Sequence, residues 1–184
     1  MDHLVYQGKE YVQVSAKKRI AVLVEREYED LELWYPYLRL VEAGYDVSVV
    51  GPEADQEYPS KHGYPIKACM GMAEGKDQDW DAVVIPGGWA PDRMRIHPEM
   101  VELVQKTNQR KGIVAAICHG PSLMVSADIV RGKKVTSYVA IKDDLVHAGG
   151  KWSDAEVVTD GNLITSRTPL DLVPFTKAIL AALQ

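Results

Sequence analysis

Long apolar segments are absent from this sequence. Its two longest uninterrupted runs, Ile113 to Cys118 and Ala178 to Leu183, are six residues each, whereas a membrane-spanning helix requires roughly 20. The opening stretch, MDHLVYQGKEYVQVSAKKR, has neither the apolar centre of a secretory signal nor the Arg-rich, acid-poor composition of an organelle presequence. We therefore expect a soluble protein with a cytoplasmic location.

Cysteine and clustered basic charge are also scarce. The two cysteines, Cys69 and Cys118, lie in different sequence contexts, and a domain of 184 residues can bury enough apolar surface to need no disulfide. We therefore expect free thiols. The formal net charge is −5 and the lysines and arginines are dispersed, which argues against a surface for nucleic acid or for anionic lipid.

The sequence does contain four short apolar runs bounded by turn residues. Their continuous hydrophobicity predicts strands that are buried on both faces. These predicted strands cover residues 20–24, 47–50, 82–85 and 113–117. Helical patterns are predicted from Leu31 to Ala43, before Gly44, from Pro98 to about Gln109, and from Asp171 to Leu183. The alternation of strands and helices predicts an α/β fold with a mainly parallel sheet.

The remaining segments complete the predicted organisation. Val157 to Thr165 is predicted as two strands around an Asp-Gly turn. Residues 52–79, rich in glycine, proline and charge, interrupt the alternation. We expect a single domain over residues 19–184 and an N-terminal extension over residues 1–18, in which residues 4–14 are predicted as a small hairpin.

The segment that carries most of the chemistry follows the fourth predicted strand, which ends at Cys118. The chain is predicted to become helical three residues later, so Cys118 has the position of a nucleophile elbow. Ala116 and Gly120 supply the small residues that such an elbow needs two places before and after its nucleophile. A helix N-terminus favours the thiolate, and backbone N–H groups such as that of His119 can hold an oxyanion. For Cys69 the structural interpretation is preferred, because it lacks such surroundings.

Three motifs in order give the chain a resemblance to a known family. They are Glu27-Tyr-Glu-Asp-Leu-Glu-Leu33, Ile85-Pro-Gly-Gly-Trp-Ala-Pro-Asp-Arg93 and Ala116-Ile-Cys-His-Gly-Pro121. With them the chain resembles the PfpI/ThiJ superfamily, which is class I glutamine amidotransferase-like, over about residues 19–183. The nearest branch looks like the PfpI intracellular cysteine peptidases and deglycases. The resemblance implies a flavodoxin-like three-layer sandwich with a cysteine nucleophile elbow.

The resemblance also implies roles for individual residues. Cys118 matches the family nucleophile, and His119 matches the histidine that accepts and returns protons. Glu29 matches the acid whose protonated carboxyl hydrogen-bonds the cysteine sulfur and stabilises its thiolate. Its neighbours Glu27 and Glu32 are expected to be solvated.

Three further positions match the family site less directly. Asp92 falls where PfpI-like members place a glutamate that reaches across a subunit interface to orient the histidine, so the shorter side chain is a departure. Gly88 matches the second oxyanion donor. Tyr138 matches an aromatic residue at the pocket rim, although plain packing explains a tyrosine equally well. The resemblance therefore implies a homo-oligomer, a dimer or a hexamer, with Asp92 acting across the interface.

Neither a metal nor a cofactor is indicated by the sequence. The other histidines have no ligand-like spacing with cysteines or carboxylates; they are His3, His62, His97 and His147. The Gly87-Gly88 pair lacks the spaced third glycine of a dinucleotide-binding fingerprint.

Three functions remain open at this point. The first is a cofactor-free stress-response enzyme acting on small reactive carbonyls, of the glyoxalase III or deglycase type, which the resemblance implies and which we favour. The second is a cysteine peptidase or amidase, using the same thiolate to form an acyl-enzyme with a peptide substrate. The third belongs to another class, a cysteine-oxidation sensor or chaperone without turnover.

Overall fold

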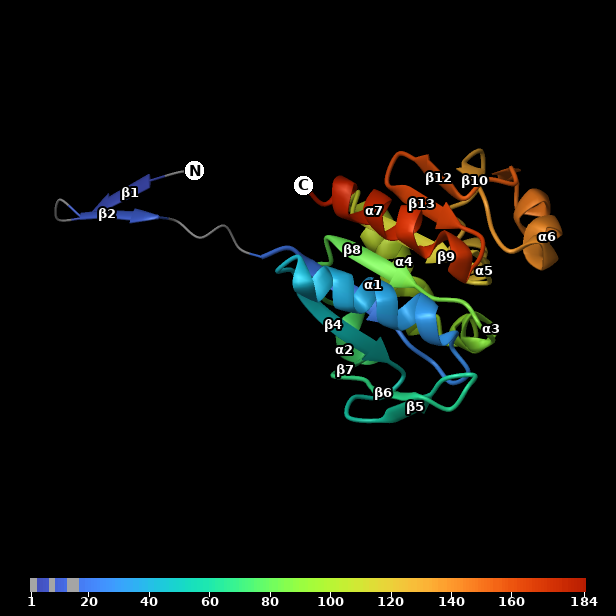
Figure 1. Cartoon of the computed structure of the whole chain (residues 1–184), viewed down its shortest axis with the longest axis horizontal. Coiled ribbons are helices and arrows are strands. Elements are labelled where there is room, and N and C mark those ends of the chain that lie inside the picture. Colours follow the sequence, from blue (N-terminus) through green and yellow to red (C-terminus); the bar gives the residue numbers. More distant parts are fainter. Residues whose placement is uncertain (1–2, 7–8, 13–16) are drawn as a thin grey trace.

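A mainly parallel sheet forms the centre of the molecule. The structure, a computed structural model, describes residues 3–6, 9–12 and 17–184 (Figure 1). The strands of the central sheet are β3 (Arg19–Leu23), β4 (Asp46–Gly51), β7 (Met70–Gly71), β8 (Ala82–Ile85), β9 (Ile113–Ile117), β12 (Val157–Asp160) and β13 (Leu163–Ser166). Among the described residues their order is β12-β13-β9-β8-β3-β4-β7, and only the β12–β13 pair is antiparallel. The mainly parallel α/β sheet predicted from the four apolar runs is confirmed.

Helices cover both faces of this sheet, which makes a three-layer sandwich (Figure 1). The helices are α1 (Asp30–Glu42), α2 (Met72–Gly75), α3 (Ala90–Met94), α4 (Pro98–Gln109), α5 (Pro121–Ser126), α6 (Lys142–His147) and α7 (Leu172–Ala182), with short 3-10 turns η1 (Val139–Ile141) and η2 (Pro169–Asp171). Helices α1 and α7 pack side by side on one face, and α4 packs with α2 and α5 on the other.

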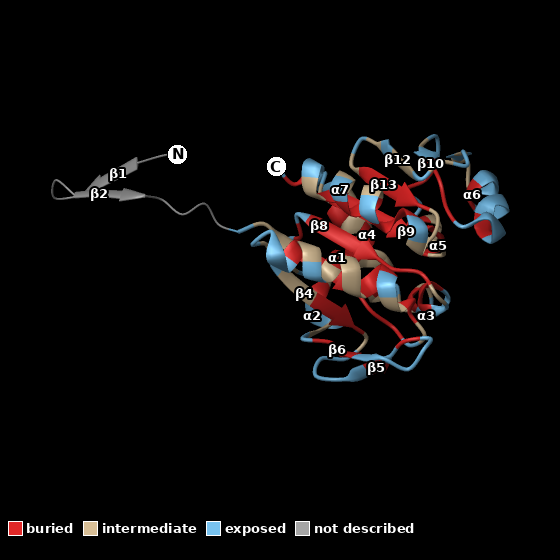
Figure 2. Ribbon diagram, viewed as in Figure 1, coloured by how far each residue is buried: buried red, intermediate tan, exposed pale blue. Residues whose placement is uncertain are grey.

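The core lies where the three central strands meet the helices. Every residue of β8 is fully buried, as are the last four residues of β3 and of β9, so the sheet is the most deeply buried part of the domain (Figure 2). Side chains on alternate faces of these strands contact opposite helix layers, and this explains their unbroken apolar sequences. Each of these strands ends at the last residue of its run of buried apolar residues or one residue before it, and the chain turns there.

Three short strand pairs lie outside the central sheet. They are β1 (His3–Tyr6) with β2 (Lys9–Val12), antiparallel; β5 (Glu57–Pro59) with β6 (Pro65–Lys67), antiparallel; and β10 (Lys134–Val135) with β11 (Lys151–Trp152), parallel. The β1–β2 pair lies in the N-terminal extension, and its connecting residues 7–8 are outside the described part of the chain. Residues 52–79, which interrupt the alternation in the sequence, hold β5, β6, the edge strand β7 and α2.

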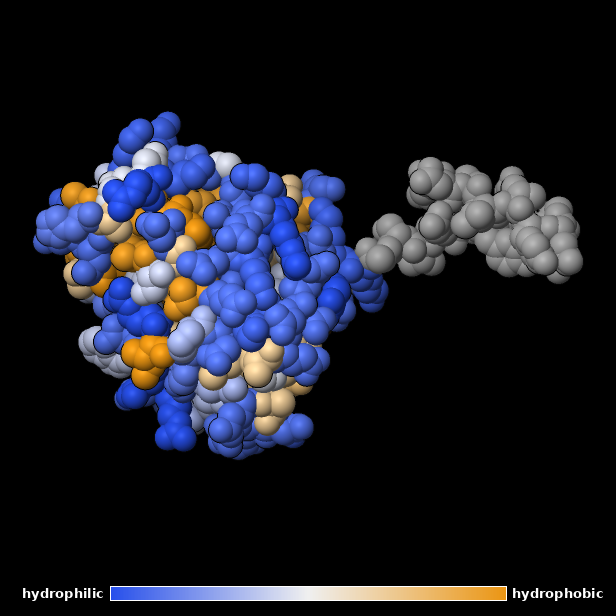
Figure 3. All heavy atoms as spheres, turned by 180° about the vertical axis from the view of Figure 1, so that it is seen from behind, coloured by the Kyte–Doolittle hydropathy of each residue, from blue (hydrophilic) through white to orange (hydrophobic). Residues whose placement is uncertain are grey.

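The parallel strands β3, β8, β9 and β13 of the central sheet end at one side of the domain, where α3 and α5 lie (Figure 1). Seen from behind, the surface is mostly hydrophilic, and apolar side chains gather at the end where Figure 1 draws α3, α5 and α6 (Figure 3). This is the end at which β8 and β9 finish. No helix in the described part of the chain is long and apolar enough to cross a membrane.

Candidate active site at the end of strand β9

Cys118 stands on a strained turn between β9 and α5. Its φ is 61°, a backbone conformation that costs free energy for any residue with a Cβ. The surrounding backbone holds it there, since the N–H of Cys118 donates to the Ser166 carbonyl over 3.1 Å and its carbonyl accepts from the Tyr138 N–H over 3.0 Å. A Cβ at Gly120 would lie 2.5 Å from the Ile85 carbonyl oxygen. The small residue predicted two places after the cysteine is therefore required by the close approach of β8.

The carboxyl group that faces the sulfur belongs to Glu32 and not to Glu29. Glu32 is fully buried, accepts a hydrogen bond from the Gly87 N–H over 2.8 Å through Oε2, and lies beside the Cys118 thiol, whose pKa it affects. The assignment of Glu29 to this place, and the expectation that Glu32 is solvated, are wrong. Glu29 instead caps helix α1, where its Oε2 accepts from the Glu32 N–H over 3.0 Å.

A signal in the sequence could have found Glu32. Within α1 the buried residues include Glu32, Pro36 and Leu40, which are spaced four apart and share one helix face. Glu29 precedes the first turn of the helix, where a carboxylate binds free backbone N–H groups. The phase of the apolar stripe, rather than the family pattern of acids, shows which glutamate points into the protein.

The Pro-Gly-Gly turn after β8 closes the site from the other side. A Cβ on Gly87 would lie 2.5 Å from Glu32 Oε2 and 2.7 Å from Cys118 Cβ, so any other residue would displace the acid or the nucleophile. The next residue, Gly88, has a φ of 74° and directs its N–H at the Cys118 sulfur. The N–H of His119 also faces that sulfur and lowers the pKa of the thiol. Both backbone donors predicted for an oxyanion thus surround the thiol.

Burial shifts the acid–thiol pair toward its protonated forms. Burial, with the nearby charge of Glu29 adding to it, raises the pKa of Glu32 from 4.5 to about 8, so its carboxyl is mostly protonated at neutral pH. Burial and the charged form of Glu32 raise the pKa of the Cys118 thiol to about 12, whereas the N–H groups of Gly88 and His119 lower it. The helix end was expected to favour the thiolate, but burial opposes it here and the pKa of the thiol is raised. When Glu32 is protonated, its charge no longer repels the thiolate of Cys118, and its O–H can donate a hydrogen bond to the sulfur.

His119 lies beside the nucleophile with its imidazole half buried. Burial lowers the pKa of this imidazole, Asp92 raises it, and Lys61 lowers it further. Asp92 is exposed on the single turn of α3. Among the residues that the structure describes, no hydrogen bond to the His119 side chain is present, so within one chain Asp92 acts on it only through charge. The role of Asp92 across an interface stays a prediction.

A pocket of about 430 Å³ opens above the sulfur. Its lining residues are Glu29, Glu32, Lys61, Gly88, Trp89, Cys118, His119, Tyr138, Thr168 and Pro169. Tyr138 is 40 % exposed and stands at the rim, in contact with the imidazole of His119. Four of these pocket residues were not predicted from the sequence, namely Lys61, Trp89, Thr168 and Pro169. Lys61 directly follows Ser60, which forms an isolated β-bridge with Tyr28. The sequence around Thr168 carries no local signal that predicts a turn at the pocket.

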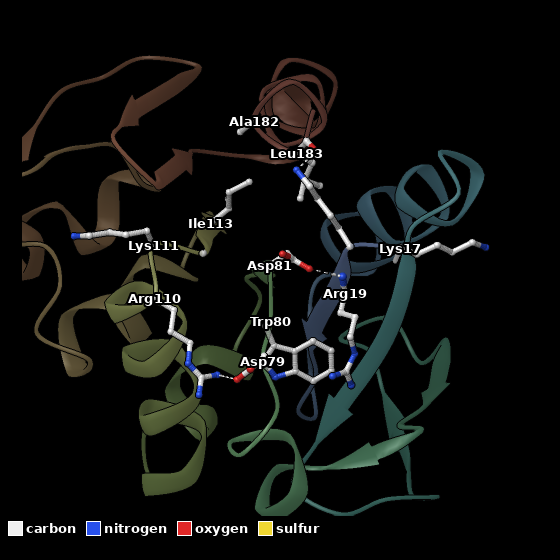
Figure 4. A pocket seen from close by; sticks show the side chains of 12 residues that line it. Lys17, Arg19, Asp79, Trp80, Asp81, Arg110, Lys111, Ile113, Ala182 and Leu183 are labelled. Carbon is white, nitrogen blue, oxygen red and sulfur yellow. Dashed lines mark hydrogen bonds and ion pairs between the residues drawn. The ribbon is translucent and has the colours of Figure 1, made fainter. Parts of the chain in front are cut away.

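A larger pocket, of about 710 Å³, lies at the opposite end of the sheet (Figure 4). Several of its charged groups pair with each other or with the backbone: Arg110 pairs with Asp79, Lys18 donates to the Leu183 carbonyl, and Asp81 accepts from the Arg19 N–H. Both helices that border it, α4 and α7, end there, and the basic side chains complement their free carbonyls. It has no nucleophile, so the chemistry belongs to the pocket at Cys118.

One group of potential metal ligands occurs among the described residues, formed by Glu29, Asp30 and His62 with ligand atoms within 4.8 Å of one another. These atoms already have partners in the protein. Asp30 accepts from the Ser60 hydroxyl over 2.6 Å and lies 2.7 Å from His62 Nδ1, and these contacts lower the pKa of Asp30. The cluster ties the loop after β5 to the start of α1.

Comparisons with known proteins show the family of the chain. The DJ-1/PfpI family matches residues 18–182. Deglycase PH1704 of Pyrococcus horikoshii is 41 % identical over 166 residues, 90 % of this chain and 99 % of that protein. The putative cysteine protease YraA of Bacillus subtilis is 40 % identical over 167 residues, 91 % of this chain and 99 % of that protein.

Among solved structures, a two-domain protein from Anabaena variabilis with DJ-1/ThiJ/PfpI-like and ferritin-like domains has 43 % identity and a TM-score of 0.87. The match covers 91 % of this chain, which spans about half (48 %) of that protein. The flavodoxin-like sandwich and the family resemblance drawn from the three sequence motifs are confirmed. With its cysteine elbow at the end of β9, this chain belongs to the DJ-1/PfpI family.

Proposed function

We propose that this chain is a cofactor-free, cysteine-dependent enzyme that acts on small reactive carbonyl compounds, namely glyoxals and their early adducts with amines or thiols. The observation that carries the proposal is the Cys118 sulfur, which lies at a pocket of about 430 Å³ and faces the Glu32 carboxyl and two backbone N–H groups. That volume suits a small molecule. Relatives that are named deglycases support the same class of substrate.

The first chemical step is addition of the sulfur to the aldehyde carbon. The thiol proton passes to the imidazole of His119, which burial keeps neutral and therefore able to accept it. As the carbon–sulfur bond forms, the carbonyl π bond breaks and its oxygen becomes an oxyanion. The N–H groups of Gly88 and His119 are the donors within reach of that oxygen. His119 then returns the proton, which gives a hemithioacetal.

The second stage converts this intermediate into an acid. His119 moves a proton from the hemithioacetal carbon to the neighbouring carbonyl carbon, and the hemithioacetal hydroxyl proton passes to the oxygen of that neighbouring carbonyl, so that the first carbon is oxidised, the second is reduced and a thioester of a 2-hydroxy acid forms. Water then hydrolyses the thioester and restores the thiol. The sum is a 2-oxoaldehyde plus water giving a 2-hydroxy acid. In an amine adduct, the carbon–nitrogen bond breaks as the carbon–sulfur bond forms, and the amine leaves with a proton from His119.

Glu32 has a defined part in the first step. Its carboxyl, mostly protonated because burial raises its pKa to about 8, acts as a hydrogen-bond donor to the sulfur while negative charge develops there. An ionised Glu32 would repel that charge. The enzyme therefore requires Glu32 to hold its proton and His119 to lack one.

The decisive experiment compares wild type, Cys118→Ser and Cys69→Ser with two substrates, methylglyoxal and a chromogenic peptide amide. Cys69 is exposed and lies outside the pocket, so Cys69→Ser is the matched control. We expect lactate from methylglyoxal with wild type and Cys69→Ser, and none with a folded Cys118→Ser. Absence of methylglyoxal turnover by wild type would refute the proposal.

The same experiment distinguishes the two other functions. Hydrolysis of the peptide amide alone would identify a peptidase, a reading favoured by the name of the Bacillus subtilis relative. Oxidation of Cys118 without turnover of either substrate would identify a sensor or chaperone.

We also propose that the chain works as a homo-oligomer in which Asp92 approaches His119 of a second copy. Asp92 is exposed on α3, and the large apolar side chains of Trp89 and Ile96 flank it with 59 % and 73 % of their surface exposed. Exposed apolar side chains of this size beside a site are typical of an interface. Sedimentation should give a dimer or hexamer, and a monomer with full activity would refute this.

A further inference from the structure

The imidazole of His119 contacts two aromatic rings. The ring of Trp89 has its centroid 5.7 Å away at an interplanar angle of 50°, and the ring of Tyr138 lies 5.4 Å away at 30°. They come from different segments, Trp89 from the turn between β8 and α3 and Tyr138 from the loop before η1. In the part of the chain that the structure describes, the side chain of His119 has no hydrogen-bonding partner that would fix its orientation.

Trp89 is held in this position by its backbone. It directly follows Gly88, whose N–H faces the sulfur, and its own N–H donates to the Glu27 carbonyl over 2.9 Å. Its ring is 59 % exposed, so it contributes little to the hydrophobic core. An indole that packs on an imidazole at the edge of the pocket, and not on the core, is placed for chemistry at that imidazole.

Aromatic rings favour the charged form of a neighbouring imidazole. A cation within about 6 Å of a ring centroid is attracted by the ring quadrupole, by ~0.5–1 kcal/mol at exposed sites and more when it is desolvated. The proposed reaction forms such a cation when the Cys118 proton moves to His119. Burial works against that charge. A ring that stabilises the imidazolium therefore offsets part of the cost of the first step.

We propose that Trp89 is a positioning residue for the reaction, whose ring orients the imidazole of His119 toward Cys118 and stabilises the imidazolium that forms there. This inference rests on the proposed function for its kinetic consequence, but the contact itself can be tested without turnover. Trp89 does not touch the reacting atoms and acts only through His119.

Other groups that face His119 bear on the same proton. The titratable and charged residues that line this pocket beside His119 are Glu29, Glu32, Lys61, Cys118 and Tyr138, and Asp92 acts on the imidazole from outside the pocket. Asp92 favours the imidazolium and Lys61 disfavours it, both through charge, so salt screens their effects. The contact with the Trp89 ring is direct, and its effect should persist at high ionic strength.

The test titrates His119 by NMR, following its ring Cε1 proton in the full chain at high salt. A His119→Ala variant assigns the signal. Trp89→Leu keeps an apolar side chain without a π system, and Trp89→Phe restores one. We expect the pKa of His119 to fall by about 0.5 in Trp89→Leu and to return in Trp89→Phe. Tyr64→Leu, which removes another exposed ring that packs on Trp34, is the matched control and should change nothing.

Kinetics supply the second measurement. With methylglyoxal, Trp89→Leu should lower kcat about threefold, leave KM within twofold and move the acidic limb of the kcat profile to lower pH by about 0.5. Trp89→Phe should recover most of the rate. An unchanged His119 pKa in Trp89→Leu, or equal behaviour of the Leu and Phe variants, would overturn the inference. If the pKa shifts but wild type turns over no carbonyl substrate, the proposed function fails and the contact between Trp89 and His119 stands.

Discussion

Replacing Glu32 by glutamine should remove a pH dependence from the stability of the whole domain. In the folded chain the Glu32 carboxyl is fully buried, and burial raises its pKa from 4.5 to about 8. In the unfolded chain the same group titrates near its ordinary value. Between these two values the folded state binds the proton and the unfolded state does not. Stability therefore falls as the pH rises through this window.

The size of the effect follows from the two pKa values. Each step of one pH unit inside the window removes ~1.4 kcal/mol from the free energy of unfolding. Between pH 4.5 and pH 8 the loss from this one group is ~4 kcal/mol. Glutamine has nearly the same shape, its amide oxygen can accept from the Gly87 N–H, and its NH₂ can donate to the sulfur. The stability of Glu32→Gln relative to wild type should therefore rise by ~4 kcal/mol from pH 4.5 to pH 8.

Urea denaturation at pH 4.5, 5.5, 6.5, 7.5 and 8 measures this directly. Glu29→Gln is the control, because it removes an equal charge three residues away; since burial is the main cause of the raised Glu32 pKa and the Glu29 charge adds to it, this variant should keep most of the wild-type pH dependence but not all of it. A Cys118→Ser background removes the thiol that titrates with Glu32 and should give the same difference curve. Parallel curves for Glu32→Gln and wild type would refute the assignment of the buried proton to Glu32.

Further predictions concern activity at the same site. The rate with methylglyoxal should rise with pH as His119 loses its proton, at a pH below the ordinary imidazole value because burial lowers the pKa of His119. The rate should fall near pH 8 as Glu32, whose pKa burial raises to about 8, ionises. A pH–rate profile of Glu32→Gln should lack this alkaline fall. Cys118→Ser should abolish turnover with an unchanged circular dichroism spectrum, and gross unfolding would instead indicate a structural cysteine. Gly87→Ala should lower kcat at least tenfold and cost ~1–3 kcal/mol in urea, because its Cβ would meet Glu32 and Cys118. A fully active Gly87→Ala would contradict the close approach.

Sequence alone could predict the parts of the fold that burial determines. Strands β8 and β9 and helix α4 have the bounds expected from their apolar runs and from Pro98, and β3 and β4 differ by one residue at each end. In an α/β fold, a short continuous apolar run forms a strand that is buried between two layers of helices. The β5–β6 hairpin was not predicted, because its three-residue strands, bounded by Pro59 and Pro65, are too short to show a period.

The candidate site likewise has a part that could be predicted from the sequence and a part that the family pattern did not give. Backbone geometry at Cys118 was predictable, because a buried strand that must turn into a helix leaves only a tight elbow between them. The family pattern alone did not identify the acid, because it offers two glutamates three residues apart and gives no information on their orientation. Helix phase does. Glu29 lies outside the first turn and binds a free N–H there, whereas Glu32 lies on the buried face that continues through Pro36 and Leu40. A carboxyl on that face loses its hydration, keeps its proton, and so becomes a donor to the sulfur. The helix that buries Glu32 for packing reasons thereby sets the protonation state that the chemistry at Cys118 requires.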